Sequence, residues 1–438
     1  MLERLTREIR EWWLTQPPSE RTEGQSQSQL GDVHTLPVLA ALERELEDDA
    51  FVVIGVHSPK FPNEQDAEMV RQAVMRYGVT HPVVVDPGRK IWDEWGVNAW
   101  PTLAIVNADG QLVAAGAGEP DLDVLREAVQ SLLELGRSEG TLDPKPLPLR
   151  PEPVQAGSLA YPAKAITHGD RLWVADTGHD QVVEFSLAGE ELSRREGFHH
   201  PNGLAFVGDT LYVADTSAGA LRTLEGRVVA ENLRSPWDLA WDGELLYIAM
   251  AGTHQIWFHD PATGETDAYA GTGRELRIDG PIGQAAFAQP SGLAFLDGSL
   301  YIADSEISSI RAIDDLRAFP KARTVCGSGE LFGFGDRDGV GDEVLLQHPL
   351  GIAAGDGDLW VADSFNHKIK RVDPQTGECR TAFGGLEQLP VTSEPGFWEP
   401  EGLAYRDGKL YVADTNNHRV VELDTQSGER RTLVGAGA

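Results

Sequence analysis

The sequence predicts two domains of different fold class: an α/β domain at the N-terminus, followed by an all-β, six-bladed β-propeller. The chain has 438 residues, which is more than a single hydrophobic core usually holds. Its first third alternates strand-like and helix-like patterns, and the remainder repeats one strand motif six times. We therefore place the domains at 1–140 and 157–438, with a Pro-rich, extended linker at 141–156.

The propeller prediction rests on a short motif that is rich in β-branched and aromatic residues, as strands are. The six copies are RLWVADT at 171–177, TLYVADT at 210–216, LLYIAMA at 245–251, SLYIADS at 299–305, DLWVADS at 358–364 and KLYVADT at 409–415. A Pro-containing strand start precedes each copy, and another strand, a polar turn and an outer strand follow it. Four strands per repeat are typical of propeller blades. Because the first and last repeats each hold all four, we expect the ring to close without a shared strand.

Three repeats are longer than the others, and their extra residues lie in Gly-, Asp- and Pro-rich stretches at 270–290, 327–348 and 384–400. Such stretches are expected to be loops. An acidic run at 336–343 superficially resembles a calcium-binding loop but lacks the full pattern of alternating ligands. Because a similar stretch at 277–287 occupies the same place in the preceding repeat, a repeated structural loop explains the run better.

The six repeats resemble NHL repeats, and YVADTNNHRVVEL at 411–423 matches that family best. The resemblance covers 157–438 and recurs six times in register. It implies a propeller whose face binds a protein or a small-molecule ligand.

Residues 1–140 carry a regular order of predicted elements. Helices are expected at 34–48, 64–77, 89–95 and 121–136, and strands at 51–57, at 81–86 and on both sides of an Asp109-Gly110 turn within 99–116. This order, with a Trp-Pro-Thr start to the penultimate strand, resembles the thioredoxin fold. The resemblance implies a cis peptide bond between Trp100 and Pro101 that faces the redox motif, and an ordinary trans proline is the alternative.

The redox motif of that fold is missing from this chain. VVIGVHSPKFPNE at 52–64, together with the propeller, resembles the NHL repeat-containing protein 2 family. That family has a Cys-x-x-Cys pair just before its first long helix, and Gln29 and Asp32 occupy the matching positions here. Because disulfide exchange requires a thiolate and no cysteine precedes Cys326, this domain alone cannot perform it. The Ser-, Gln- and Gly-rich composition of the surrounding stretch predicts a flexible segment at 20–33.

The chain has two cysteines, Cys326 and Cys379, which are 53 residues apart. This spacing fits neither a redox pair nor a zinc-ligand cluster. We expect both to be small buried residues of propeller strands, and a disulfide between them is the alternative.

Five of the six motif copies end their strand with an aspartate. These residues are Asp176, Asp215, Asp304, Asp363 and Asp414, and Met250 replaces the aspartate in the third copy. A feature that nearly every blade shares is usually structural. We therefore expect these carboxylates to tie down the following turn rather than to form a metal-binding ring.

Departures from the repeat point to the central channel. Two residues after the first proline of each repeat, four blades have Gly, the first has Lys164 and the third has Asp238. The candidate ligand site comprises Lys164, Asn202, Trp237, Asp238, Ser291 and Glu401. One alternative is a solvated channel with an inconsequential ion pair between Lys164 and Asp238. Another is a calcium or magnesium site of Asn202, Asp238 and Glu401, which resembles those of lactonase-like propellers.

The formal net charge is −32, from 37 Lys and Arg against 69 Asp and Glu, so we expect neither nucleic acid nor a membrane as a partner. Charges interrupt residues 1–13, which lack the apolar core of a secretory signal, and no apolar stretch is long enough to span a bilayer. These features predict a cytoplasmic protein. No motif calls for a cofactor, so none is expected, and no metal site is assigned.

The leading hypothesis is a non-catalytic binding or scaffold protein, in which an intact propeller carries a degenerate thioredoxin-like module. Family resemblance implies a different function, that of a thiol-disulfide oxidoreductase whose cysteine pair is missing through divergence or through a local error in the reading frame. A third possibility is a metal-dependent propeller hydrolase that uses the channel residues. The sequence leaves these three open.

Overall fold

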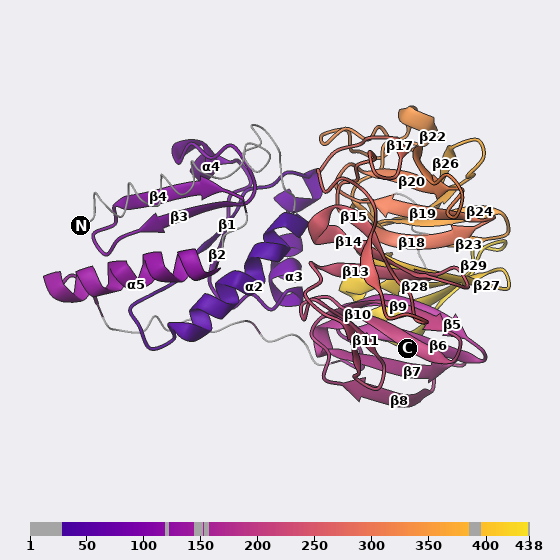
Figure 1. The fold of residues 1–438 in the computed structure, drawn as a ribbon, viewed down its shortest axis with the longest axis horizontal. Coiled ribbons are helices and arrows are strands. Elements are labelled where there is room, and N and C mark those ends of the chain that lie inside the picture. The colour runs from indigo at the N-terminus through magenta and orange to yellow at the C-terminus, as the bar shows by residue number, and fades with distance from the viewer. Residues whose placement is uncertain (1–28, 119–121, 144–151, 153–156, 385–395, 437–438) are drawn as a thin grey trace. The chain divides into compact units, whose positions relative to one another are not determined.

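The computed structural model describes residues 29–118, 122–143, 152, 157–384 and 396–436. The chain forms two compact units, Met1–Pro153 and Val154–Ala438 (Figure 1). The boundary between them falls inside the predicted linker, of which residues 144–151 and 153–156 lie outside the described part.

The N-terminal unit has the predicted order of helices and strands. Its elements are α2 (Gln29–Glu45), β1 (Gly55–His57), the 3₁₀ helix η1 (Pro62–Gln65), α3 (Ala67–Arg76), β2 (Val83–Val85), α4 (Lys90–Glu94), β3 (Thr102–Val106), β4 (Leu112–Ala117) and α5 (Leu122–Glu139). β1 pairs in parallel with β2, and β3 pairs antiparallel with β4. No strand of the described residues joins these pairs, so the unit holds two separate two-stranded sheets.

Helices α2 and α5 supply the core of this unit. Its buried residues are Leu39, Leu42, Leu46, Leu125, Val129 and Leu133, with Phe51, Val53, Leu103 and Ile105 packed against them. Successive side chains of an extended segment point to opposite faces. Val52, Ile54 and Val56 accordingly point away from this core and are 40%, 58% and 44% exposed. The segment through β1 is therefore covered on one face and leaves apolar side chains exposed on the other.

Helix α2 begins at Gln29, earlier than the predicted start at residue 34. This corrects the predicted flexible segment at 20–33, because residues 29–33 are helical, whereas residues 20–28 lie outside the described part. Leu30, Val33 and Leu36 recur at every third position, which extends the apolar spacing of the helix toward its N-terminus. Polar composition suggested flexibility here, but the spacing of the few apolar residues favours a helix.

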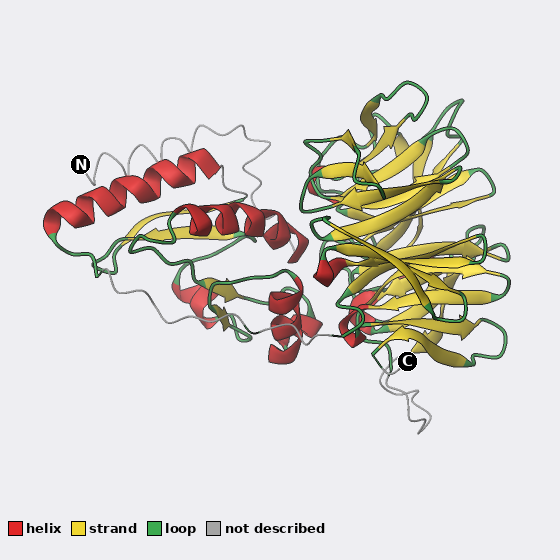
Figure 2. Cartoon of the chain, turned by 90° about the horizontal axis from the view of Figure 1, so that it is seen from below, coloured by secondary structure: helices red, strands yellow, loops and turns green. Residues whose placement is uncertain are grey.

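The C-terminal unit is a ring of six antiparallel sheets, the blades of a β-propeller (Figure 2). The first blade comprises β5 (Pro162–His168), β6 (Arg171–Asp176), β7 (Gln181–Ser186) and β8 (Glu191–Glu196), and the second β9 (Pro201–Val207), β10 (Thr210–Asp215), β11 (Ala220–Thr223) and β12 (Val228–Ala230). The third comprises β13 (Pro236–Trp241), β14 (Leu246–Met250), β15 (Gln255–His259) and β16 (Thr266–Ala270), and the fourth β18 (Pro290–Leu296), β19 (Ser299–Asp304), β20 (Ser309–Asp314) and β21 (Lys321–Cys326). The fifth comprises β23 (Pro349–Gly355), β24 (Asp358–Asp363), β25 (Lys368–Val372) and β26 (Glu378–Gly384), and the sixth β27 (Pro400–Arg406), β28 (Lys409–Asp414), β29 (Arg419–Asp424) and β30 (Arg430–Gly435).

The fourth and fifth blades each gain a short fifth strand. β17 (Gly280–Pro281) pairs with β21, and β22 (Gly339–Val340) pairs with β26. The prediction that the stretches at 270–290 and 327–348 are loops is therefore wrong in part, because each contains a short strand. The outer strand of a blade has unpaired backbone groups along its free edge, and a neighbouring segment can pair with them even when its composition is typical of a loop. In the third long stretch, residues 385–395 lie outside the described part.

The prediction that the ring closes without a shared strand is confirmed, because the first and last blades each hold four strands of their own. Buried residues of both blades form one core, which contains Leu159, Ala165, Leu172, Val174, Val183, Phe185, Tyr411, Val420, Leu433 and Val434. The hydroxyl of Thr415 donates to the carbonyl of Pro162 at 2.8 Å, and the N–H of Tyr161 donates to Nδ1 of His418 at 3.1 Å. Packing and hydrogen bonds therefore close the ring.

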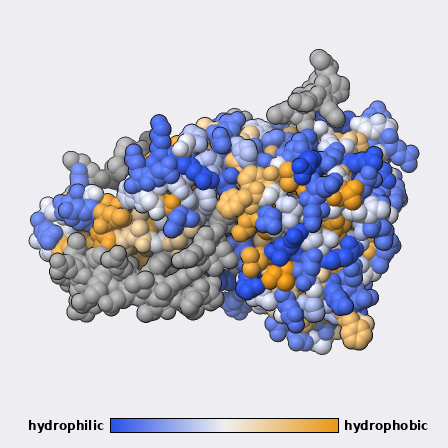
Figure 3. Space-filling model, turned by 90° about the horizontal axis from the view of Figure 1, so that it is seen from above, coloured by the Kyte–Doolittle hydropathy of each residue, from blue (hydrophilic) through white to orange (hydrophobic). Residues whose placement is uncertain are grey.

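Most apolar side chains of the propeller lie between blades. The fourth and fifth blades, for example, share a core that includes Ile310, Ile352 and Val372. In the view of Figure 3, hydrophilic side chains cover most of the described propeller surface, and hydrophobic ones form smaller patches. Phe319 and Phe332 are exceptions to this burial, at 78% and 61% exposed.

Candidate functional site

The five repeated aspartates are buried and make one hydrogen bond in common. All five side chains are 0% exposed. Their Oδ1 atoms accept from backbone N–H groups 16 residues earlier in the chain, at 2.5–2.8 Å: those of Ala160, His199, Ala288, Gln347 and Trp398. Each bond ties the end of a blade's second strand to the segment that leads into its first strand.

The second oxygen of each aspartate is also paired. The Oδ2 atoms accept from the side chains of Gln181, Arg222, Arg311, Asn366 and Arg419, at 2.6–3.0 Å. Buried carboxylates need such partners, because an unpaired charge in the interior is costly. The repeated aspartates therefore hold each blade together, and their oxygens are occupied by protein donors.

The third blade lacks this arrangement at Met250, which is buried. The N–H of Gly252 donates to the carbonyl of Arg234 at 3.2 Å, and every other blade has the same backbone bond, such as that from Gly178 to Ala160. The third blade therefore keeps the backbone bond that all six blades share and lacks the side-chain bonds of the aspartate.

A hydroxyl after the repeated aspartate joins neighbouring blades. The side chains of Thr177, Thr216, Ser364 and Thr415 donate to the carbonyls of Pro201, Pro236, Pro400 and Pro162, the first residue of the next blade, at 2.6–2.8 Å. Ala251 stands at this position in the third blade and has no hydroxyl to donate. Sequence analysis did not assign this bond, although the recurring Asp-Thr or Asp-Ser pair was its signal.

A second bond between blades comes from the fourth residue after the motif position. Asp180, His254, Ser308, His367 and His418 have left-handed backbones, with φ between 46° and 57°. Their side chains accept the N–H groups of His200, Gln289, His348, Glu399 and Tyr161, each just before the first proline of the next blade, at 2.7–3.2 Å. In the second blade, Gly219 has no side chain to serve as the acceptor.

Three of these acceptors are histidines, which accept the bond through Nδ1 and are therefore neutral. Burial lowers the pKa of His254 and of His367 to about 4. Burial also lowers the pKa of His418, which Asp176 only partly opposes. The neutral form is consequently the one that these blade contacts require.

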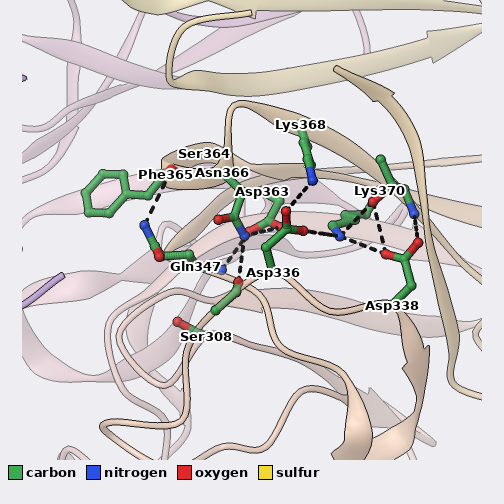
Figure 4. A network of polar contacts seen from close by, with 12 residues as sticks. Ser308, Asp336, Asp338, Gln347, Asp363, Ser364, Phe365, Asn366, Lys368 and Lys370 are labelled. Atoms are coloured by element: carbon green, nitrogen blue, oxygen red, sulfur yellow. Dashed lines mark hydrogen bonds and ion pairs between the residues drawn. The ribbon is translucent and has the colours of Figure 1, made fainter. Parts of the chain in front are cut away.

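The acidic run at 336–343 belongs to a polar network of the fifth blade. Figure 4 shows Asp336 and Asp338 directed at Lys370, whose Nζ lies 3.0 Å and 2.8 Å from their oxygens. Lys370 is 0% exposed, and burial opposes its charge, but the nearby carboxylates outweigh this and raise its pKa to about 12. Burial also raises the pKa of Asp363 to about 7, against the attraction of Lys370. The acidic run therefore serves to pair a buried lysine.

The same network recurs in the fourth blade. Asp279 accepts from the N–H and the hydroxyl of Thr324 and pairs with Arg311 at 2.7 Å. In the fifth blade, Asp338 accepts from the N–H and the hydroxyl of Thr381 in the same way. This equivalence agrees with the prediction that the two stretches repeat one structural segment, although each contains a short strand.

Lys164 and Asp238, the two charges that interrupt the ring of glycines, form an ion pair. Nζ of Lys164 lies 2.7 Å from Oδ2 of Asp238, and the two residues are 6% and 3% exposed. The blade between them contributes Gly203, where a Cβ would lie 2.6 Å from Cα of Asp238. The pair thus spans from the first blade to the third past a glycine. Both members of the pair are buried, so the alternative of a solvated ion pair is wrong.

Unpartnered polar atoms belong to Asp238 and to Asn202, the residue before Gly203. Asn202 is 2% exposed, and neither its Oδ1 nor its Nδ2 has a hydrogen-bond partner. The second carboxylate oxygen of Asp238, Oδ1, also has none, whereas Oδ2 additionally accepts from the N–H of Leu293 at 3.0 Å. Asn202 directly precedes Gly203, so both groups flank one glycine. Buried polar atoms without partners are uncommon and suit a small polar ligand.

The other predicted channel residues have different surroundings. The Ser291 hydroxyl bonds to the carbonyl of Gln289 and the hydroxyl of Ser305, so it is engaged within its own blade. Trp237 and Glu401 are 5% and 2% exposed. Among the described residues, no three His, Cys, Asp or Glu side chains are grouped as a metal site would require.

In the N-terminal unit, the Trp100–Pro101 peptide bond is cis, as the resemblance implied. Nε1 of Trp100 donates to the carbonyl of Ser58 at 2.7 Å, and its ring centroid lies 4.1 Å from that of Trp92. The guanidinium of Arg89 lies over both indoles, 4.8 Å and 5.6 Å from their centroids. Sequence analysis did not single out Arg89 or Trp92, because only the fold brings them to the segment before the cis proline.

The family's two cysteine positions fall in the first turn of α2, at Gln29 and Asp32. The structure describes only the backbone there. Cys326 and Cys379, in contrast, are both buried in propeller strands and free, as predicted.

Residues 397–423 match the model of the NHL repeat. With six blades built on one motif, the C-terminal unit is an NHL-type β-propeller. Protein SUPPRESSOR OF QUENCHING 1, chloroplastic, of Arabidopsis thaliana is 38% identical over 465 aligned residues, covering 92% of this chain and 44% of that protein. Human NHL repeat-containing protein 2 is 34% identical over 471 aligned residues, covering 90% of this chain and 65% of that protein.

This chain belongs to the family of NHL repeat-containing protein 2. It spans less than two thirds of the length of these two relatives. A shorter match is the thiol-disulfide oxidoreductase ResA of Halalkalibacterium halodurans, 27% identical over 104 residues, which are 24% of this chain and 54% of that protein. In the part of the chain that the structure describes, no helix has the length and apolar character needed to cross a membrane.

Proposed function

We propose that this protein is a non-catalytic binding or scaffold protein, in which the propeller offers the binding face and the N-terminal unit is a degenerate thioredoxin-like module. The observation that carries the proposal is the occupation of the first turn of α2 by Gln29 and Asp32. Neither side chain forms a thiolate, which is the attacking group in disulfide exchange. No cysteine lies in the N-terminal unit.

Several features support a thioredoxin-like module. The order of helices and strands, the cis Trp100–Pro101 bond and the partial similarity to ResA agree with it. In a thioredoxin fold, the start of the helix after the central strand holds the redox pair. A helix N-terminus stabilises a thiolate, because its unpaired N–H groups carry partial positive charge. The position therefore suits cysteines, although this chain has none there.

Restoring the cysteine pair tests both parts of the proposal. We expect wild-type protein not to reduce insulin disulfides in the presence of dithiothreitol. The double variant Gln29→Cys/Asp32→Cys is expected to form an internal disulfide and to accelerate the reduction, while a matched Gln29→Ser/Asp32→Ser variant stays inactive. Wild-type turnover that disappears in Cys326→Ala or Cys379→Ala would overturn the non-catalytic assignment. A cysteine pair that forms its disulfide but gives no turnover would argue against the thioredoxin-like module.

A thiol-disulfide oxidoreductase is the second candidate, because the name of ResA states that activity and 104 residues of this chain align with that protein. It requires a Cys-x-x-Cys in the native protein near residues 29 and 32. Intact mass and peptide mapping of protein isolated from its natural source decide this. Two cysteines in the peptide that contains these positions would favour the oxidoreductase.

We place the ligand site of the propeller at Lys164, Asn202 and Asp238. Two observations support this placement: Lys164 and Asp238 form a buried ion pair, and the Asn202 amide and one carboxylate oxygen of Asp238 have no hydrogen-bond partner. A neutral solute with both a donor and an acceptor satisfies these atoms, whereas a purely apolar solute does not.

A panel of small amides and polyols tests this site through the thermal unfolding midpoint. We expect at least one solute to raise the midpoint of wild-type protein through binding to the folded state, and the Asn202→Leu variant to lose that increase. The Ser193→Ala variant, altered on an outer strand of the first blade, serves as the control and keeps it. An increase that is equal in all three proteins would place the binding elsewhere.

A further inference from the structure

Cys326 and Cys379 are neighbours in the fold, although 53 residues separate them in the sequence. Cys326 ends β21 in the fourth blade, and Cys379 is the second residue of β26 in the fifth. Both residues are 0% exposed and belong to one buried cluster, and the side chain of Cys379 has the largest effect on the pKa of the Cys326 thiol. The two cysteines therefore lie near each other at the interface between two blades.

The backbone on either side of the pair is fixed by contacts between the same blades. The N–H of Gly327 donates to the carbonyl of Gly341 at 3.1 Å, and the N–H of Gly341 donates to the carbonyl of Gly377 at 3.0 Å. A Cβ at Gly377 would lie 2.5 Å from the carbonyl oxygen of Val325, so these two segments touch. A disulfide requires this kind of close approach between the strands that carry its cysteines.

The surroundings of the pair are apolar. Val325, Val344, Leu346 and Val372 belong to the same buried cluster as the two cysteines. The side chain of Cys379, reinforced by burial, raises the pKa of the Cys326 thiol well above its ordinary value. A thiol in such surroundings is unreactive while the blades stay closed, so oxidation requires local opening of the interface.

We propose that Cys326 and Cys379 form a redox-dependent cross-link between the fourth and fifth blades, with hydrogen peroxide as the oxidant. When the interface opens, one thiol loses its proton and its sulfur attacks a peroxide oxygen. The O–O bond breaks, a sulfenic acid forms, and the released hydroxide takes up the proton as water. The second sulfur then attacks the sulfenic sulfur, an S–S bond forms, and the hydroxyl leaves with the remaining thiol proton as a second water molecule.

In this reaction the two thiols lose two hydrogen atoms and two electrons, and one peroxide molecule becomes two water molecules. The resulting disulfide joins outer strands of neighbouring blades and restricts the unfolded chain between them. Such a restriction raises the stability of the folded state unless the bond is strained. The inference does not depend on the proposed binding function, because neither cysteine belongs to the ligand site.

Oxidation of the full-length protein tests the proposal directly. We expect hydrogen peroxide, applied at a temperature just below the unfolding midpoint, to remove both free thiols and to lower the intact mass by two hydrogen atoms. Peptide mapping without reductant should recover the peptides of Cys326 and Cys379 joined in a monomer. The thermal unfolding midpoint should then rise, and dithiothreitol should reverse both changes.

The single variants Cys326→Ala and Cys379→Ala serve as matched controls, since each keeps one thiol in the same cluster. Neither can give the internal cross-link, and their midpoints should not rise on oxidation. The peptide map of wild-type protein remains decisive even if a variant folds poorly. Addition of oxygen to separate cysteines, or a cross-link between two chains, would overturn the proposal.

Discussion

Two single residues, Lys164 and Asp238, place buried charges inside this propeller. Lys164 and Asp238 replace glycine in a ring of inner-strand positions and pair at 2.7 Å in nearly complete burial. Removing water from both charges is expensive, and their attraction offsets this only while both are present. The pair therefore makes the first and third blades interdependent, and the blade between them contributes Asn202, whose buried amide has no hydrogen-bond partner.

Removing one member of this pair is expected to be costly. The Lys164→Met variant should lower the free energy of unfolding by about 3–5 kcal/mol, because it leaves a buried carboxylate without its cation. Urea denaturation measures this change. In Lys164→Met/Asp238→Asn, the neutral amide can still accept from Leu293, so part of the loss should be recovered.

An exposed ion pair provides the control for this prediction. Arg380 pairs with Glu378 on the outer strand of the fifth blade, where the two side chains are 72% and 41% exposed. The Arg380→Ala variant should change the free energy of unfolding by less than about 1 kcal/mol. Equal losses in Lys164→Met and Arg380→Ala would contradict the assignment of a tightly coupled buried pair.

At the scale of elements, an aspartate ties five of the six blades internally, and a hydroxyl ties four of them to the next blade. In the fourth blade, the hydroxyl of Ser305 bonds to the carbonyl of Gln289 instead. The third blade departs from both patterns, with Met250 and Ala251 in place of Asp and Thr or Ser. The turn η3 (Ala251–Thr253) is nevertheless formed in the same place as the other 3₁₀ turns. The interface between the third and fourth blades therefore keeps this turn but lacks the hydroxyl bond that four other interfaces have.

Adding the missing hydroxyl should strengthen this interface. We expect Ala251→Thr to raise the free energy of unfolding by about 1 kcal/mol, through a bond to the carbonyl of Pro290 that repeats those of four other blades. The reverse change at an intact interface, Thr216→Ala, should lower it by a similar amount because it removes the 2.6 Å bond to Pro236. A loss of stability in Ala251→Thr would show that the third blade has no room for the hydroxyl.

At the scale of the whole molecule, the ring depends on contacts between distant parts of the chain. His418 accepts from Tyr161, 257 residues away, and this bond joins the last blade to the first. His254 and His367 make the equivalent bonds at two other interfaces. Three of the six interfaces thus require a neutral imidazole, so the integrity of the ring is linked to pH.

Acid should weaken the ring through these histidines. The ordinary pKa of histidine is near 6.5, and burial lowers that of His254 and of His367 to about 4 in the folded state. Between these values the unfolded chain binds more protons, so the free energy of unfolding falls as the pH decreases from about 6.5 to about 4. Over this range, each of these two histidines lowers the free energy of unfolding by about 3 kcal/mol. Above about pH 7 the histidines are neutral in both states, so this loss of stability is absent.

Asparagine provides a non-titrating replacement for this test. It tolerates the left-handed backbone, and its carbonyl can accept as the carboxylate of Asp180 does in the first blade. The triple variant His254→Asn/His367→Asn/His418→Asn should therefore show a flatter dependence of stability on pH than wild-type protein, measured by urea denaturation between about pH 4 and pH 7. Identical slopes in both proteins would refute the role of these histidines.

Much of the element pattern was predictable because it depends on local sequence. The strand motif, the aspartate at its end and the Trp-Pro-Thr segment are each encoded within a few residues, and the structure has the expected strands, turns and cis bond there. The short strands β17 and β22 were not predictable. They form because a distant outer strand offers free hydrogen-bonding groups, whereas their own composition is typical of a loop.

The candidate site was predictable only as a set of residues. Irregularities in the repeat singled out Lys164, Asp238 and Asn202, but the repeat contains no information on which side chains reach each other. The blade-to-blade bonds of the three histidines were missed for the same reason, because their acceptors and donors lie in different repeats.

The number of blades, the order of elements in the N-terminal unit and the lack of cysteine there could be predicted from the sequence, since these depend on residue types and on local spacing. Which buried charges pair, which polar atoms lack partners and which side chains share a cluster with Cys326 became known only from the folded ring. The physical reason is that closing the ring brings together atoms from different blades. Their separation in space follows from the packing of whole sheets, and not from their separation along the chain.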